Sequence, residues 1–320
     1  MTGVGAYLPE TILTNDDLSE FVDTDDSWIR QRTGIISRRK ANPDELTSDL
    51  AVKAANKALQ SAGLSINDID CIVLATTTPD FTFPSTATIV QQKLGAINAF
   101  AFDVQAVCAG FVYALSVANG LMCAGQGSNT LVIGAETFTK LLDWNDRSTC
   151  VLFGDGAGAV VLQAENSEEG YGIIANTLHS DGRFKDILYV DGGVSSTGSI
   201  GHVKMQGKEV FKHAVEKLSS AMEKVLNMSN LTSEDIDWLV PHQANIRIIN
   251  SMQRKLNLPD EKVIKTIFHH ANTSAASIPL ALNSGVETGK IKSGHLLALE
   301  AIGGGLSWGA SLVRYGRPGK

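Results

Sequence analysis

The sequence predicts an α/β fold built from two similar halves. Helix-like segments alternate with short apolar runs typical of buried strands, which indicates mainly parallel sheets covered by helices on both faces. The order of motifs in the first half returns in the second, which indicates an internal duplication. The chain has 320 residues, of which 43% are hydrophobic and 19% charged, so it can bury one large core or two fused ones.

The predicted elements of the first half surround one uncharged segment. No charged residue occurs from Val104 to Ala135, and the part that follows Cys108 lacks a polar face, which is typical of a helix enclosed on all sides. Apolar spacing predicts helices over residues 49–63, 84–94 and from about 108 onward. Buried strands are predicted over residues 68–77, 100–104, 129–136 and 159–162.

The second half repeats these patterns in the same order. Residues 231–240 resemble 64–73, residues 291–300 resemble 125–136, and residues 309–312 resemble 158–161. A long helix is predicted over 207–227, with strands over 238–240, 296–301 and 308–313. We therefore expect two halves, residues 1–165 and 166–320, which meet near Glu165.

Composition excludes several classes of function. The net charge is −7 and no dense Lys/Arg stretch interleaves with aromatic residues, so nucleic acid is not expected as a partner. No apolar run reaches the roughly 20 residues of a membrane span, and the first residues do not read as a secretory signal. Four cysteines without metal or disulfide spacing predict free thiols in a reducing cytoplasm. His269 and His270 are expected in an extended segment facing opposite ways, so no metal site is predicted.

Three polar residues are candidates for chemistry, each with a simpler alternative. Cys108 begins a predicted helix, whose dipole favours a thiolate, although a free cysteine often packs as a small apolar residue. His242 follows a predicted strand at the edge where α/β sheets bind ligands, although a lone histidine is more often a satisfied polar group. Asn272 precedes a predicted helix, where capping is the usual role.

Two glycine-rich stretches also have competing interpretations. Residues 154–158 superficially suggest a nucleotide loop, but a strand-like run follows them instead of a helix, so a bend or a close-packing device is expected. Residues 303–305 make either a turn or a group of backbone N–H donors for an oxyanion, and the turn alone is the simpler interpretation.

Taken together, the motifs resemble those of the β-ketoacyl-[acyl-carrier-protein] synthase III family, the initiating condensing enzymes of bacterial fatty-acid synthesis in the thiolase superfamily. The resemblance runs from Gly3 to Tyr315 and implies a thiolase-like fold with α-β-α-β-α layers. Its motifs here are Trp28-Ile29 with residues 32–35, residues 106–111, 153–158, 241–245 and 272–277, and Gly303-Gly304-Gly305 with Trp308-Gly309.

The resemblance implies a decarboxylating condensation of acetyl-CoA, or another short acyl-CoA, with malonyl-carrier protein. Cys108 matches the family's nucleophile, and His242 and Asn272 match the donors to the enolate oxygen. Elongating enzymes carry a second histidine where Asn272 stands. Backbone N–H groups of Cys108 and Gly305 are expected to hold the other oxyanion. No tightly bound cofactor is implied, since CoA arrives as a substrate.

The resemblance also implies substrate contacts. Trp28 and Arg147 are expected to sandwich the CoA adenine and Arg32 to face its phosphates. Lys208 and Asn245 complete the CoA set, and Lys208 stands where the family usually has Asn or Arg. The implied acyl pocket, whose large side chains suggest a short primer, consists of Phe83, Phe138, Phe153, Leu188, Val203 and Leu306.

An acidic acyl carrier protein is the implied partner, and a homodimer is expected. The implied docking residues are Lys212, Gln243, Ala244, Asn245, Ile246, Arg247, Arg254 and Lys255. One departure concerns Ala271, which stands in place of the usual glycine before the asparagine. If this position needs a positive φ, Ala271 adopts it only with strain.

Three alternatives remain open at the level of sequence. An enzyme of the same fold can pass the acyl group from Cys108 to another acceptor. A non-catalytic partner of a condensing enzyme usually loses the nucleophile, which this chain keeps. A papain-like thiol hydrolase also uses Cys, His and Asn, but the duplicated α/β halves argue against that fold.

Overall fold

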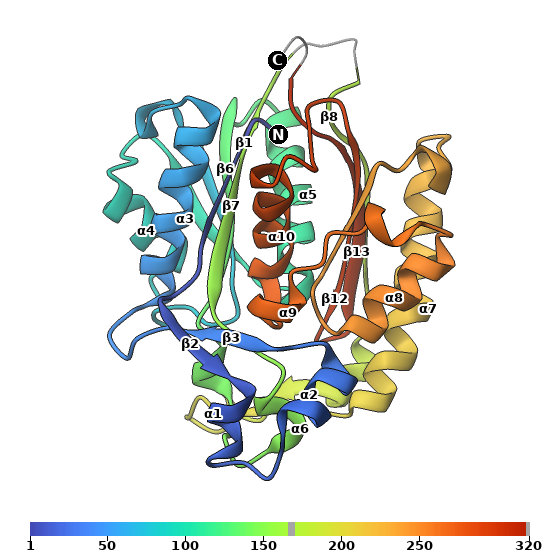
Figure 1. Ribbon diagram of the computed structural model, residues 1–320. Helices are drawn as coiled ribbons and strands as arrows, with labels where there is room; N and C mark the ends of the chain where they lie inside the picture. The colour runs from blue at the N-terminus through green and yellow to red at the C-terminus, as the bar shows by residue number, and fades with distance from the viewer. Residues whose placement is uncertain (166–169, 318–320) are drawn as a thin grey trace.

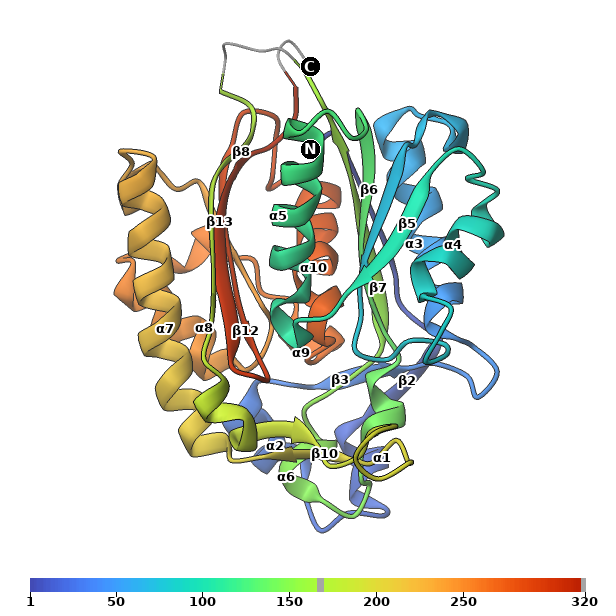
Figure 2. The same ribbon diagram turned by 180° about the vertical axis from the view of Figure 1, so that it is seen from behind.

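The computed structural model describes residues 1–165 and 170–317, which form five layers. Two sheets each lie between layers of helices, as Figures 1 and 2 show. From one side to the other, the helical layers are α3 (Thr47–Ala62) with α4 (Thr86–Leu94), α5 (Gly110–Cys123) with α10 (Ser277–Glu287), and α7 (Gly207–Met228) with α8 (Ile246–Lys255). The predicted α-β-α-β-α arrangement is confirmed.

The first sheet has five strands in the order β1-β7-β6-β4-β5. Pairing is parallel between β4 and its neighbours β5 and β6, and antiparallel from β6 through β7 to β1. The strands are β1 (Gly3–Tyr7), β4 (Cys71–Ala75), β5 (Phe100–Val104), β6 (Asn129–Glu136) and β7 (Gly156–Gln163).

The second sheet has four strands in the order β11-β12-β13-β8. Only the β11–β12 pair is parallel, and the other two pairs are antiparallel. The strands are β8 (Gly172–Ser180), β11 (Trp238–Pro241), β12 (Leu296–Gly303) and β13 (Ser307–Arg314). The expectation of mainly parallel sheets is wrong, because apolar runs reveal that a strand is buried but not its direction.

The middle layer forms the shared core of the two sheets. Its helix α5 buries Phe111, Val112 and Leu115, and α10 buries Ile278 and Leu282, all in one apolar cluster with residues of both sheets. Burial on several faces explains why the sequence from Val104 to Ala135 carries no charge. None of the helices in the described ranges is both long and apolar enough to cross a membrane.

Shorter elements form a cap below the layers in Figure 1. The cap combines segments between residues 11 and 40, 147 and 150, and 188 and 205. Its helices and strands are β2 (Thr11–Thr14), α1 (Asn15–Ser19), α2 (Asp26–Thr33), β3 (Ser37–Lys40), α6 (Arg147–Cys150), β9 (Leu188–Val190) and β10 (Val203–Met205), with α9 (Ile267–His270) nearby. Short 3₁₀ turns are η1 (Ile66–Asp68), η2 (Val107–Ala109), η3 (Phe138–Leu141), η4 (Gly182–Ile187), η5 (Ser233–Asp235), η6 (Asp260–Lys262) and η7 (Ser274–Ala276).

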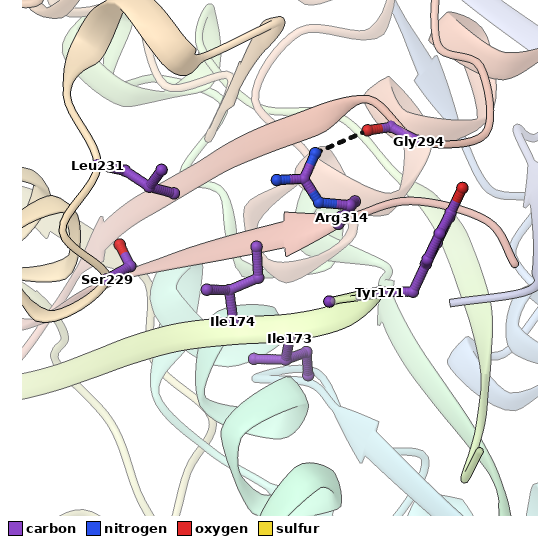
Figure 3. Close-up of a pocket in the computed structure, with 8 residues that line it drawn as sticks. Tyr171, Ile173, Ile174, Ser229, Leu231, Gly294 and Arg314 are labelled. Carbon is purple, nitrogen blue, oxygen red and sulfur yellow. Dashed lines mark hydrogen bonds between the residues drawn. The ribbon is translucent and has the colours of Figure 1, made fainter. Parts of the chain in front are cut away.

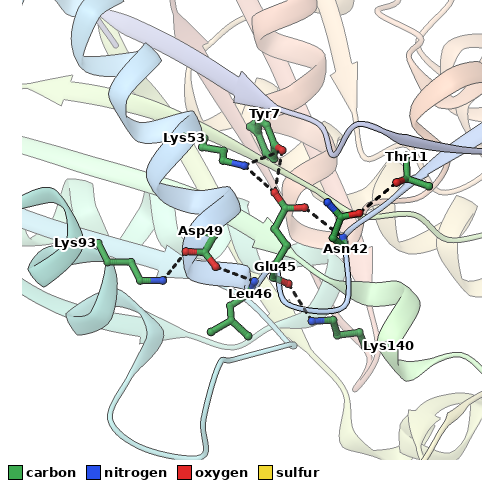
Figure 4. A network of polar contacts seen from close by, with 9 residues as sticks. All are labelled: Tyr7, Thr11, Asn42, Glu45, Leu46, Asp49, Lys53, Lys93 and Lys140. Atoms are coloured by element: carbon green, nitrogen blue, oxygen red, sulfur yellow. Dashed lines mark hydrogen bonds and ion pairs between the residues drawn. The ribbon is translucent and has the colours of Figure 1, made fainter.

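A polar network fastens the first strand to the outer helix α3 (Figure 4). Glu45 accepts hydrogen bonds from the Tyr7 hydroxyl at 2.8 Å and from Lys53 Nζ at 2.8 Å, and its backbone oxygen accepts from Lys140 Nζ at 3.0 Å. One turn into α3, Asp49 pairs with Lys93 of α4 at 2.6 Å. These contacts hold the N-terminal strand, α3 and the start of the cap as one unit.

Two local predictions need correction. His269 and His270 lie on the single turn of α9 and not in an extended segment, because residues 266–271 make helical hydrogen bonds. The stretch 154–158 does not make a bend at Gly156 or Gly158, since both glycines are part of strand β7. The close-packing role is confirmed at Gly158, where a Cβ would lie 2.7 Å from the backbone of Leu280.

The predicted division into residues 1–165 and 166–320 stays a prediction. The strands of the five-stranded sheet lie between residues 3 and 163, and those of the four-stranded sheet lie between 172 and 314. The second half would begin at residue 166, and residues 166–169 lie outside the described residues.

Candidate active site

The three residues expected to carry the chemistry follow three different elements and are all buried. Cys108 lies in η2 after β5, His242 directly follows β11, and Asn272 follows α9. Their exposed fractions are 4%, 5% and 6%.

Cys108 sits on a strained turn at the start of α5. Val107 before it has a φ of 50°, a conformation that β-branched residues rarely adopt, and Gly303 of β12 lies so close that a Cβ there would be 2.6 Å from the Cys108 nitrogen. Burial, with a smaller contribution from the Glu136 carboxyl, raises the pKa of the Cys108 thiol to about 12. The expected thiolate is therefore not the resting form, because burial outweighs the helix dipole.

The hydrogen bonds of His242 engage one ring nitrogen, Nδ1, and leave the other, Nε2, for a substrate. Its backbone N–H donates to the Glu300 carbonyl at 2.8 Å, and its Nδ1 lies 2.6 Å from Ser277 Oγ. The Gln243 N–H donates to that same oxygen at 3.3 Å, so the Ser277 hydroxyl is free to donate to Nδ1. Burial lowers the pKa of His242 to about 3. The ring is thus neutral, and its Nε2–H is the remaining donor.

Asn272 is oriented by its neighbours in the same way. Its backbone accepts from Gly154 N and donates to the Leu152 oxygen, both at 3.0 Å, which fastens it beside β7. Its Oδ1 accepts from the Ser274 N–H at 2.9 Å. Because the side-chain oxygen is occupied, the amide NH₂ is left to donate to a substrate.

Residues 272–277 connect the three side chains. Asn272 begins this segment, η7 (Ser274–Ala276) within it packs against the η2 turn that carries Cys108, and Ser277 holds His242. Gly134 of β6 lets the segment approach, since a Cβ there would lie 2.3 Å from the Ala275 oxygen. Sequence reasoning recognised this motif but gave Ser274 and Ser277 no role, although two hydroxyls beside a reactive asparagine were a usable signal.

The arrangement provides a nucleophile and two neutral hydrogen-bond donors. A buried imidazole Nε2–H and an amide NH₂ suit an oxyanion that develops on a substrate, because donors in a water-poor site need no reorganisation. Glu136 lies near the thiol but accepts from the hydroxyls of Thr76 at 3.3 Å and Thr78 at 2.7 Å, so it is a bonded structural group. Among residues 1–165 and 170–317, no three His, Cys, Asp or Glu side chains gather as metal ligands.

Three of the five residues expected to bind CoA lie together on the cap, and a fourth, Asn245, adjoins them at the start of α8. The Arg32 and Arg147 guanidinium carbons lie 4.5 and 4.9 Å from the Trp28 ring centre. Asn245 Nδ2 donates to the Arg32 carbonyl at 3.1 Å. The fifth residue, Lys208, is exposed in the first turn of α7. Arg147 already contacts the Trp28 ring, so an adenine enters between them only if one of the two moves.

The expected acyl-pocket residues divide into an interior group and one outlier. Phe138, Phe153 and Val203 form a small buried cluster with Leu188 against it, and the two phenylalanine rings stack at 4.3 Å. Leu306 is also buried, in the neighbouring cluster. Phe83 is 84% exposed and lines no interior surface of this chain. Residue 83 lies in a surface loop before α4, so its place in an acyl pocket stays a prediction.

The expected carrier-protein residues lie on or just before α7 and α8. All but Gln243 are at least partly exposed. Lys212 and Lys255 line one surface groove, while Arg247 and Arg254 are exposed on α8. Asn245 caps α8, and Ala244 and Ile246 beside it are partly buried. Gln243 is fully buried, and its amide bonds the backbone of Pro241, Ile264, Thr266 and Ile267. It cannot contact a partner, so that prediction is wrong.

Another hollow on the molecule holds none of the predicted residues. It lies at the β8 edge of the second sheet (Figure 3). Arg314 donates there to the Gly294 carbonyl at 3.0 Å. Its lining residues are Gly170, Tyr171, Ile173, Ile174, Ser229, Leu231, Gly294 and Arg314.

Comparisons with known proteins identify the family of the chain. Residues 102–182 match the family model of 3-oxoacyl-[acyl-carrier-protein (ACP)] synthase III, and residues 210–315 match the model of its C-terminal part. A β-ketoacyl-[acyl-carrier-protein] synthase III of Hyphomonas neptunium is 58% identical over 314 residues, covering 98% of this chain and 97% of the relative. A Ruegeria pomeroyi synthase III is 58% identical over 316 residues, with 98% of both chains covered.

A solved structure is similar over the same length. The 3-oxoacyl-[acyl-carrier-protein] synthase III of Aquifex aeolicus has a TM-score of 0.93 and 46% identity, covering 98% of this chain and 99% of that one. The fold, the buried Cys-His-Asn site and the full-length likeness agree. The chain belongs to the β-ketoacyl-[acyl-carrier-protein] synthase III family, whose members are condensing acyltransferases of fatty-acid synthesis.

Proposed function

We propose that this chain condenses acetyl-CoA with malonyl-carrier protein in two half-reactions at Cys108, giving a 3-oxoacyl-carrier protein, CoA and CO₂. The observation that carries the proposal is the segment from Asn272 to Ser277. It orients one amide donor, contacts His242 Nδ1 through Ser277 and packs against the turn that carries Cys108. A nucleophile combined with two neutral donors suits acyl transfer followed by enolate formation.

In the first half-reaction, the Cys108 sulfur attacks the acetyl thioester. The sulfur–carbonyl bond to CoA breaks, and the thiol proton of Cys108 ends on the CoA sulfur. Because one thioester replaces another, the exchange is nearly balanced in energy. The backbone N–H groups of Cys108 and Gly305 stabilise the tetrahedral oxyanion.

In the second half-reaction, malonyl-carrier protein loses CO₂ and its thioester becomes an enolate. His242 Nε2–H and the Asn272 amide donate hydrogen bonds to the enolate oxygen. The enolate carbon then attacks the acetyl carbonyl on Cys108, the carbon–sulfur bond breaks, and the released thiolate takes up one proton. Losing one such donor costs on the order of 100-fold to 1000-fold in rate.

The remaining predicted residues receive the substrates. Trp28, Arg32, Arg147, Lys208 and Asn245 bind CoA, with adenine replacing the direct Arg147–Trp28 contact. The stacked Phe138 and Phe153 rings leave little depth for an acyl chain, which favours a short primer. Basic side chains of α7 and α8 attract the acidic carrier protein, and these are Lys212, Arg247, Arg254 and Lys255.

A homodimer in the cytoplasm completes the proposal. Strand β5 is the edge of the first sheet, its Phe100 is partly exposed, and Phe81 and Phe83 are exposed in the loop before α4. An edge strand flanked by exposed aromatic residues favours pairing with a second copy. Four cysteines without a disulfide suit a reducing compartment. Light scattering should give the mass of two chains, and the mass of one chain would contradict the dimer.

The two half-reactions can be separated experimentally. Radioactive acetyl-CoA should label the wild-type chain at Cys108 and leave Cys108→Ser unlabelled. His242→Ala and Asn272→Ala should retain part of the labelling and lose CO₂ release from malonyl-carrier protein by about 100-fold or more. Labelling without an acetoacetyl product would point to another acceptor, and absence of labelling would point to a non-catalytic partner. Either result would overturn the proposal.

A further inference from the structure

Glu300 is a buried carboxyl group that the proposed reaction leaves unused. It lies on β12 and is 1% exposed. Both of its side-chain oxygens are buried without a hydrogen-bond partner in the described ranges 1–165 and 170–317. Leaving a buried polar group unpaired is costly, so such a side chain needs an unseen partner or a function.

The side chain of Glu300 points toward the outer helical layer. Along β12, Leu299 and Ala301 pack into the core shared with α5 and α10, whereas Ala298 and Ile302 pack with α7 and α8. Because side chains alternate along a strand, Glu300 shares the side of Ala298 and Ile302. Figure 1 shows β12 between the middle layer and α8.

A small cavity lies on that side, and it also reaches His242. It is about 10 Å³ in volume, close to the least that holds one water molecule. Helix α7 contributes Leu218 to the lining and α8 contributes Ile248 and Ile249, so neither helix places a charge there. Of the eight lining residues only Glu300 and His242 can titrate.

The repeat in the sequence provides an internal comparison. Glu136 occupies the position of Glu300 in the first half, at the end of β6, and it is equally buried. Its oxygens accept from Thr76, Thr77 and Thr78 at distances down to 2.7 Å. One copy of this acid is therefore fully bonded, and the other faces a cavity beside His242.

We propose that Glu300 is a neutral acid that shares a water-sized cavity with His242, and that its ionisation in alkaline solution slows condensation without slowing acylation of Cys108. Ser277 holds Nδ1 of His242 and Nε2–H faces the substrate, so Glu300 acts on the ring through its charge state and not through a hydrogen bond to a ring nitrogen. A charge at Glu300 would lie near the negative enolate oxygen and repel it. Burial raises the pKa of Glu300 to about 8, which agrees with a neutral acid at pH 7. Glu300 is thus a positioning residue, and the inference rests on the role proposed for His242.

The test compares the pH dependence of the two half-reactions in wild-type protein and Glu300→Gln. The amide keeps the size of the side chain and cannot ionise. Wild-type CO₂ release should fall at least about tenfold between pH 7 and pH 9.5, and Glu300→Gln should lack that fall. Labelling of Cys108 by acetyl-CoA should show no such loss in either protein.

A second measurement, the infrared spectrum, does not depend on turnover or on the stability of the variant. The infrared spectrum of the wild-type protein should contain a protonated-carboxyl band at pH 7 that disappears near pH 8, and subtraction of the Glu300→Gln spectrum assigns it. Glu136→Gln is the matched control and should lower the melting temperature while keeping the alkaline fall. An active wild-type enzyme without an alkaline fall, a fall that persists in Glu300→Gln, or a missing band would overturn the inference. A wild-type enzyme inactive at every pH would instead refute the proposed function.

Discussion

Three residues beside the nucleophile hold backbone angles that side chains rarely adopt. Their φ values are 50° at Val107, 57° at Ala271 and 49° at Ser274. Each such residue costs on the order of 1–3 kcal/mol and persists only where the surroundings impose it. Val107 precedes Cys108, and Ala271 and Ser274 lie on either side of Asn272, so the strain lies where the reacting groups must be held.

Replacing Ala271 by glycine should stabilise the fold. With φ 57° and ψ −159°, Ala271 lies in a region that is essentially restricted to glycine. Relief of this strain exceeds the entropy that glycine adds to the unfolded chain, so Ala271→Gly should raise the free energy of unfolding by about 1 kcal/mol. Denaturant titration measures it. Ala276→Gly, at an ordinary φ of −76°, should destabilise and serves as the control; equal effects at both sites would contradict the explanation.

Removing the Ser277 hydroxyl should impair the second half-reaction more than the first. Without a donor at Nδ1, His242 no longer favours the tautomer whose Nε2–H faces the substrate. A hydrogen bond contributes about 1 kcal/mol, so Ser277→Ala should slow CO₂ release roughly fivefold while acetyl labelling persists. Ser116→Ala on α5, which loses a 2.9 Å bond to Asn176 of β8, should change neither rate. Equal slowing of both steps by Ser277→Ala would refute the assignment.

At the scale of elements, the site depends on how closely β6 and β12 approach neighbouring backbone. Gly134 of β6 faces the Ala275 carbonyl, and Gly303 of β12 faces the Cys108 nitrogen. Because glycine has no side chain, each of these positions leaves room for a turn to approach the strand. Gly134 admits η7, and Gly303 admits η2, which carries Cys108.

A methyl group at Gly134 should disturb both stability and condensation. Its Cβ would lie 2.3 Å from the Ala275 oxygen, so η7 must shift. Gly134→Ala should cost about 1–3 kcal/mol of unfolding free energy, as overpacked cores do, and should slow CO₂ release. Gly120→Ala on α5 has open space and should instead stabilise by up to about 1 kcal/mol. Thermal melting with a condensation assay compares the two, and a harmless Gly134→Ala would contradict the packing argument.

For the molecule as a whole, burial shifts the pKa values of two neighbouring residues, His242 and Glu300, in opposite directions. Burial lowers the pKa of His242 from 6.5 to about 3 and raises the pKa of Glu300 from 4.5 to about 8. Between pH 4.5 and pH 6.5 the unfolded chain protonates the histidine and the folded chain protonates the glutamate. The proton numbers match, so this pair contributes no slope to the stability there.

Outside that window the pair makes stability depend on pH. Above pH 6.5 the folded chain alone keeps the Glu300 proton, so the free energy of unfolding should fall by up to about 1.4 kcal/mol per pH unit until pH 8. Below pH 4.5 the unfolded chain holds the extra proton, so stability falls as pH falls. Glu300→Gln should remove the alkaline fall and create a rise from pH 4.5 to 6.5. Urea titrations across pH test this, and an unchanged curve would contradict it.

The sequence by itself determined the local elements and the residue types of the site. Strands over residues 100–104 and 129–136 and the helix starting at Thr86 follow from short-range patterns, which depend on neighbours along the chain. Cys108, His242 and Asn272 were recognised from their motifs, and the relatives identify the family. The tertiary structure alone decided the mixed strand directions, the burial of Gln243, the exposure of Phe83 and the hydrogen bond from Ser277 to His242. These features depend on contacts between segments distant in sequence, and local patterns do not encode which segments meet or in what register.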